Sequence, residues 1–162
     1  MVGKQSYFVL CTVAAIVSAC GVNAAREDPD VFRSEMNKYR GMSSAIHIES
    51  FSEPRSFDTV MGDIKPVAER CLTHNRAGTP TMKIPGSSSV AVVNVKSPGK
   101  ATLVYWADGL IFLLTDFEAA GPSTKITITR SHGYSDVEGD IRLWASGKNR
   151  ECQEHFKLPL VD

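Results

Sequence analysis

The sequence has no excess of charge of either sign. Lys and Arg together number 18, Asp and Glu also number 18, and no run of five like charges occurs. A surface that neutralises phosphate groups would leave a large positive excess. We therefore expect no nucleic-acid partner.

The sequence patterns that mark many enzymes are also missing. No Gly-x-Ser-x-Gly elbow and no glycine-rich phosphate loop occurs, and the serines at 87–89 are typical of a turn. The histidines lie far apart and lack the short spacings of metal ligands. They are His47, His74, His132 and His155. We expect a noncatalytic protein without a cofactor or a metal, although folding could still assemble a composite site around a histidine.

Acidic residues recur at every second position near the C-terminus. Asp136, Glu138 and Asp140 surround Gly139, but their spacing is not that of a calcium-binding loop. The alternation predicts a solvated edge of a strand.

Long apolar segments are absent except near the N-terminus. Residues 7–19 are almost wholly apolar and follow Lys4, but the segment is too short to cross the hydrocarbon layer comfortably. Its length and its flanking charge are typical of a signal peptide. The sequence therefore predicts export.

The end of this segment resembles the lipobox of bacterial lipoprotein precursors. Its residues are Val17, Ser18, Ala19, Cys20 and Gly21, and Val17 stands where Leu is commonest. The resemblance implies cleavage before Cys20, a diacylglycerol on its thiol, and a membrane anchor without a transmembrane helix. Gly21 in place of Asp implies sorting to the outer membrane, as in enterobacterial lipoproteins. The resemblance covers residues 1–21 and implies nothing about the mature fold.

A second cleavage site remains open. Val22 and Ala24 are small residues that would suit cleavage after Ala24, which would release a soluble periplasmic protein. With lipidation, residues 1–19 are the signal peptide and residues 20–27 are the lipidated cysteine and a tether. Residues 28–162 then form a single domain, long enough to bury its own core.

Two cysteines remain for the mature domain, because Cys11 leaves with the signal peptide and Cys20 is lipidated or lost. Cys71 and Cys152 predict one disulfide in an exported protein. The alternative is a pair of buried free thiols.

A short helix is predicted over residues 29–40. Asp28 suits the N-cap and a proline follows it at the first helical position. Phe32, Met36 and Tyr39 share one stripe, which we expect to dock on the domain.

The remaining elements are one long helix and a series of strands. Residues 53–73 have the clearest helical period, with a kink expected at Pro66. Alternation and turn residues predict strands at 43–50, 90–95, 102–107, 110–117, 125–130 and 140–145. Asp108 and Gly109 separate two of them as a tight hairpin turn. The predicted fold class is α+β: an antiparallel meander of about six strands, one long helix packed on one face, and a short N-terminal helix.

The central strands are apolar on both faces, and the long helix can cover just one. The short helix, the loops or curling of the sheet would cover the other face. Alternatively, an apolar binding face would remain exposed for a partner, with the aromatic anchors Tyr105, Trp106, Phe112 and Trp144. The function expected is a membrane-anchored envelope lipoprotein that acts as a structural or protein-binding module. The alternative is a carrier of a lipid or an acyl chain.

Overall fold

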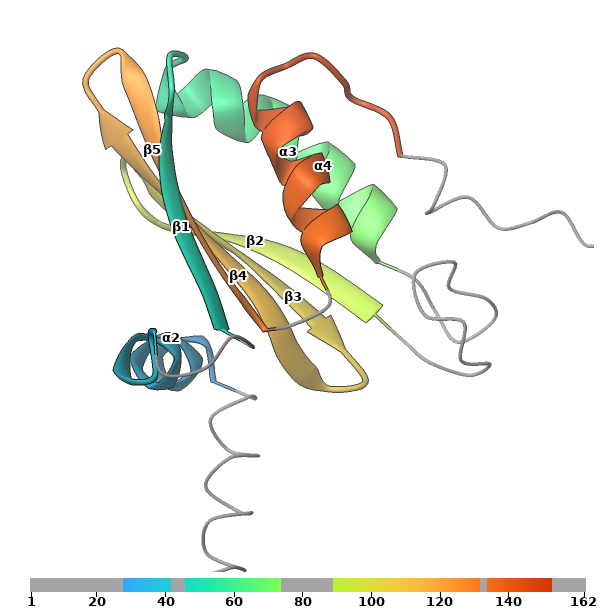
Figure 1. Cartoon of the computed structure of the whole chain (residues 1–162). Coiled ribbons are helices and arrows are strands. Elements are labelled where there is room, and N and C mark those ends of the chain that lie inside the picture. Colours follow the sequence, from blue (N-terminus) through green and yellow to red (C-terminus); the bar gives the residue numbers. More distant parts are fainter. Residues whose placement is uncertain (1–27, 42–45, 74–88, 132–133, 153–162) are drawn as a thin grey trace, which may run out of the picture.

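The fold is built on one antiparallel sheet, and the computed structural model describes residues 28–41, 46–73, 89–131 and 134–152 (Figure 1). The strands are β1 (Ile46–Glu53), β2 (Ser89–Ser97), β3 (Lys100–Ala107), β4 (Leu110–Ala120) and β5 (Ser123–Ser131), in the sheet order β1-β5-β4-β3-β2. The α+β class and the antiparallel sheet are confirmed.

Strands β2 to β5 form the predicted meander, in which neighbours in sequence are neighbours in the sheet. Asp108 and Gly109 make the two-residue turn between β3 and β4, with φ angles of 50° and 80°. A tight hairpin turn needs positive φ at both positions, which Asp and Gly tolerate better than other residues. The predicted hairpin is confirmed.

Among the strands of the described residues, β1 comes first in the sequence but lies beside the last one, β5. It pairs with β5 from Ile46 opposite Ser131 to Glu53 opposite Thr124. Its alternate residues therefore belong to the same two faces as those of the meander.

The helices cover both faces of the sheet. Helices α3 (Phe57–Leu72) and α4 (Ser135–Ala145) lie side by side over one face, and α2 (Pro29–Lys38) lies over the opposite face (Figure 1). We call the face under α3 and α4 the inner face and the face under α2 the outer face.

The main core fills the space between the inner face and helices α3 and α4. Helix α3 begins after its N-cap Ser56, continues without interruption through Pro66, and contributes a long buried stripe. The largest fully buried side chains of this core are Ile64, Leu72, Leu103, Tyr105, Leu113, Phe117, Ile126, Ile128, Ile141 and Trp144.

A smaller core lies on the outer face under α2. Phe32 is 1% exposed and packs with Val104, Ile111 and Leu114. The Asp28 carboxylate accepts hydrogen bonds from the backbone of the first turn, as its N-cap position predicts. The apolar outer face is thus partly covered by α2, as one of the sequence interpretations held.

The predicted stripe of α2 needs one correction. Met36 packs against the smaller core together with Phe32, but Tyr39 is 41% exposed. Tyr39 lies beyond the last helical residue, Lys38, so the period of the helix no longer directs it toward the sheet.

The prediction of a sixth strand at residues 140–145 is wrong, because this segment is part of α4. The segment also fits a helical period: Val137, Ile141, Trp144 and Ala145 are all buried. A strand would have buried Leu143 and exposed Trp144, whereas Leu143 is 40% exposed and Trp144 is fully buried. The short alternation could not distinguish the two periods, and packing on α3 decided between them.

The predicted disulfide between Cys71 and Cys152 is present. It joins the end of α3 to the chain that follows α4, so it fixes both helices over the inner face. Within the ranges given above, none of the helices has the length and apolar character needed to cross a membrane.

Candidate functional site

A cluster of five charged or titratable side chains lies at the β1 edge of the inner face. We call it the edge cluster: His47 and Glu49 on β1, Arg130 on β5, and Glu138 and Arg142 on α4. His47 and Glu49 are two positions apart and share a face, and Arg130 is the cross-strand partner of His47. Glu138 and Arg142 are one helical turn apart, so α4 directs both toward the same edge.

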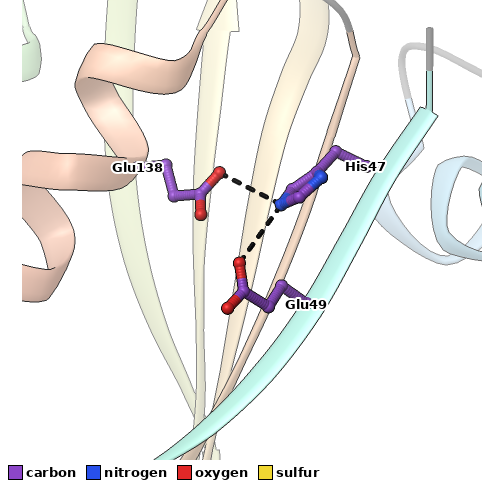
Figure 2. Close-up of side chains that lie close together, drawn as sticks. All are labelled: His47, Glu49 and Glu138. Atoms are coloured by element: carbon purple, nitrogen blue, oxygen red, sulfur yellow. Dashed lines mark hydrogen bonds and ion pairs between the residues drawn. The ribbon is translucent and has the colours of Figure 1, made fainter. Parts of the chain in front are cut away.

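The imidazole of His47 points between two carboxylates (Figure 2). Its Nε2 atom lies 3.3 Å from Glu49 Oε2 and 3.5 Å from Glu138 Oε2. One ligand atom from each of the three residues lies within 4.8 Å of the others, a group that could hold a metal ion. Folding has therefore assembled a composite histidine site.

Two arginines balance the charge of these carboxylates. Arg130 Nε donates to Glu138 Oε2 at 2.6 Å, and Arg142 Nη2 donates to Glu138 Oε1 at 3.1 Å. Arg142 Nη2 also lies 2.7 Å from Glu49 Oε2. The guanidinium group of Arg142 lies over the ring of Phe51, 4.2 Å from its centroid.

The members of the edge cluster differ in how deeply they are buried. The Glu138 side chain is 10% exposed, whereas those of His47 and Glu49 are 41% and 45% exposed. Burial by itself raises the pKa of Glu138, but the hydrogen bonds from Arg130 and Arg142, together with the nearby positive charge, lower the pKa below its ordinary value. Glu138 is thus a fixed negative charge at the base of the cluster.

The prediction of a solvated strand edge at Asp136, Glu138 and Asp140 is wrong. These residues belong to the first turns of α4, and Glu138 and Asp140 are buried. The i, i+4 pair of Glu138 and Arg142 was a helical signal present in the sequence. The contact of Glu138 with His47 could not be predicted, because it depends on the pairing of β1 with β5.

The four aromatic residues expected to form one binding face do not share a face. Tyr105 and Trp144 are fully buried in the main core, and Phe112 packs against the same core beside Tyr134. Trp106 lies on the outer face and packs against the core under α2. A β-bulge between β3 and β4 at Tyr105 and Trp106 shifts the register there.

Other expected sites lie outside the described residues. These are Cys20 with its lipid, the tether at 20–27, and three of the histidines, His74, His132 and His155.

A polar groove, which the sequence analysis did not predict, lies on the outer face beside α2. It has a volume of about 330 Å³. Its lining comprises Arg33, Lys96, Lys100, Ala101, Thr102, Asp116, Phe117, Glu118 and Thr127. Seven of these nine residues have polar or charged side chains, with charges of both signs, while Ala101, Phe117 and the aliphatic parts of the long side chains leave the groove surface of mixed polarity.

A bidentate ion pair fixes the groove to α2. Arg33 donates to Asp116 through Nε at 2.9 Å and through Nη2 at 2.8 Å. Thr102 donates to the same carboxylate at 2.7 Å. The register of β3 and β4 places Thr102 opposite Asp116. Nothing local in the sequence indicates that Arg33 would reach this pair.

The lysines of the groove are held more loosely. Lys96 is paired with Asp30 at 3.3 Å and Lys100 with Glu118 at 3.1 Å, all four on exposed side chains. Ion pairs exposed to water are weak and exchange readily. These lysines can therefore turn toward a ligand or a partner.

No known family model matches this chain, and no curated protein matches it. Among solved structures, the chain is similar to the Mll3558 protein from Rhizobium loti, with 12% identity, a TM-score of 0.37, and coverage of 64% of this chain and 96% of that one. DynU16, from the dynemicin biosynthetic locus, has 15% identity, a TM-score of 0.35, and coverage of 67% and 46%. An uncharacterised protein from Rhizobium leguminosarum has 4% identity, a TM-score of 0.27, and coverage of 62% and 88%. TM-scores this low do not establish a shared fold.

Proposed function

We propose that this chain is a lipoprotein of the bacterial envelope, anchored to the outer membrane through Cys20, and that its domain is a noncatalytic module that binds another envelope protein. The observation that carries the proposal is the polar groove beside α2. A groove lined by cations, carboxylates and hydroxyl groups suits the polar surface of a protein, whose side chains can replace the exposed ion pairs.

The chemistry of the groove argues against an acyl chain as its occupant. An apolar chain would remove water from the Arg33–Asp116 pair and from Lys96 and Lys100 without giving them new partners. Desolvating charged groups in this way is costly. The alternative function, a lipid carrier, would need a cavity between helices and sheet, where Tyr105, Trp144 and their neighbours fill the main core. The protein-binding module is therefore the better supported of the two.

The position of the groove suits a partner at the membrane surface. The predicted tether, residues 20–27, spans at most about 30 Å when fully extended, and α2 follows it directly. Because Arg33 of α2 lines the groove, the groove would lie on the part of the domain closest to the anchor. A membrane-bound partner would then meet it at high local concentration.

Crosslinking in living cells tests the proposed interface. A photoreactive amino acid at position 100, in the groove, should yield one discrete crosslinked species in the membrane fraction. The matched control is position 65, also an exposed lysine but on α3 over the inner face. Charge reversal by Lys96→Glu should weaken the crosslink from position 100. Equal crosslinking from both positions, or none from position 100, would contradict the proposed interface.

The anchor has a separate test. Intact mass spectrometry of the protein from its native membrane should show a diacylated or triacylated N-terminal Cys20, and Cys20→Ala should move the protein to the soluble fraction. A mature chain that begins at Ala25 would instead mean a secreted domain. Persistence of the Cys20→Ala variant in the membrane would rule out the lipid anchor.

A further inference from the structure

We propose that His47, Glu49 and Glu138 form a binding site for one divalent transition-metal ion, with Zn²⁺ the best fit. Nε2 of His47 lies 3.3 Å and 3.5 Å from the two carboxylate oxygens. In a tetrahedral zinc site with bonds of about 2.1 Å, neighbouring ligand atoms lie about 3.4 Å apart. Both distances from Nε2 therefore already match those of a shared ion, and the two carboxylate oxygens lie within 4.8 Å of each other, so a small movement of exposed Glu49 would complete the site.

The deepest ligand is already oriented for this role. Glu138 is almost fully buried, and Arg130 donates to its Oε2 atom at 2.6 Å. A carboxylate oxygen has two lone pairs, so Oε2 can accept from Arg130 and still bind an ion. Hydrogen bonds of this kind fix the ligands of metal sites and favour their charged form.

The other two ligands, His47 and Glu49, leave the position of the proposed ion open to solvent. His47 and Glu49 lie on the edge strand β1 with more than a third of each side chain exposed. An ion can therefore enter from solvent, and a water molecule can complete the coordination.

Arg142 competes with a metal ion for the two carboxylates. Its Nη2 atom contacts both carboxylates, and its charge would repel a metal ion. The side chain of Arg142 is 33% exposed and can turn into solvent, whereas that of Arg130 is 15% exposed and lies deeper. Metal binding would then displace Arg142 from Glu49 and leave Arg130 on Glu138.

The donor set also predicts which ions bind. An imidazole nitrogen with two carboxylate oxygens suits Zn²⁺ and its neighbours in the transition series. Ca²⁺ prefers six to eight oxygen ligands and should bind poorly. This site is independent of the proposed protein interface, which lies on the opposite face of the sheet.

Calorimetric titration of the full chain, stripped of metal by a chelator, tests the site. Zn²⁺ should bind at His47 with one equivalent, and Ca²⁺ should give no comparable signal. His47→Gln and Glu138→Gln should each weaken this binding at least about tenfold. Arg142→Gln should instead tighten it about fivefold or more, because a competing charge is removed.

One control separates this site from adventitious binding. Glu118→Gln, which removes a half-exposed carboxylate of the groove on the opposite face, should leave the affinity unchanged. Circular dichroism of each variant without metal shows whether it is folded. The proposal is overturned if the wild type does not bind Zn²⁺, if folded His47→Gln binds as tightly as wild type, or if Arg142→Gln weakens binding.

Discussion

Replacing Phe32 by Ala should detach α2 from the outer face. Phe32 is 1% exposed and is the fully buried side chain that α2 contributes to the smaller core. Truncation of a buried Phe to Ala lowers the stability of the structure that it holds by about 3–5 kcal/mol, because apolar burial is lost and a cavity remains. The matched control is Val31→Ala on the same helix, where the side chain is 43% exposed and the cost should stay within about 0.5 kcal/mol.

Two measurements report this detachment. Chemical denaturation gives the free energy of unfolding, and hydrogen exchange of the amides at 32–38 gives the opening of α2 by itself. Helix α2 packs on a separate small core. We therefore expect Phe32→Ala to lower the free energy of local opening of α2, measured by exchange, more than it lowers the free energy of global unfolding. The groove should be lost with α2, so crosslinking from position 100 should fall as well. If Phe32→Ala and Val31→Ala behave alike in both measurements, α2 does not dock through Phe32.

Three further changes test the fold. Trp144→Ala should lower the free energy of unfolding by about 3–5 kcal/mol, and Leu143→Ala should change it by less than about 1 kcal/mol; the reverse order would favour a strand over α4. Thiol labelling of the unreduced, denatured protein should find neither Cys71 nor Cys152 free, and reduction should lower the stability by up to about 4.5 kcal/mol, given the sequence separation of 81; two labelled thiols would exclude the disulfide. Gly109→Ala should cost about 1 kcal/mol in thermal unfolding because φ is 80° there, and an unchanged melting temperature would mean that the turn relaxes.

Several elements could be predicted because their signals are local. The N-cap at Asp28 and the turn at Asp108 and Gly109 each depend on residues within a few positions of one another. The apolar stripe of α3 is long enough for its period to be unambiguous. The segment at 140–145 was too short for this, and its period was misread.

The sequence by itself also favoured the disulfide, since the predicted export would leave a domain with two cysteines to pair in an oxidising compartment. It predicts the export signal and the lipidation of Cys20 as well, and these remain predictions. Such signals are read from residue identity and short spacing, and they need no knowledge of the fold.

The tertiary structure alone decided where charged side chains meet. His47 reaches Glu138 because β1 pairs with β5, a strand about 80 residues later in the sequence, and because side chains of α4 reach that edge. Arg33 reaches Asp116 because Phe32 docks α2 on the outer face. Contacts between residues this distant in the chain leave no periodic trace in a single sequence, since the apolar core that brings them together is itself set by the packing of whole elements.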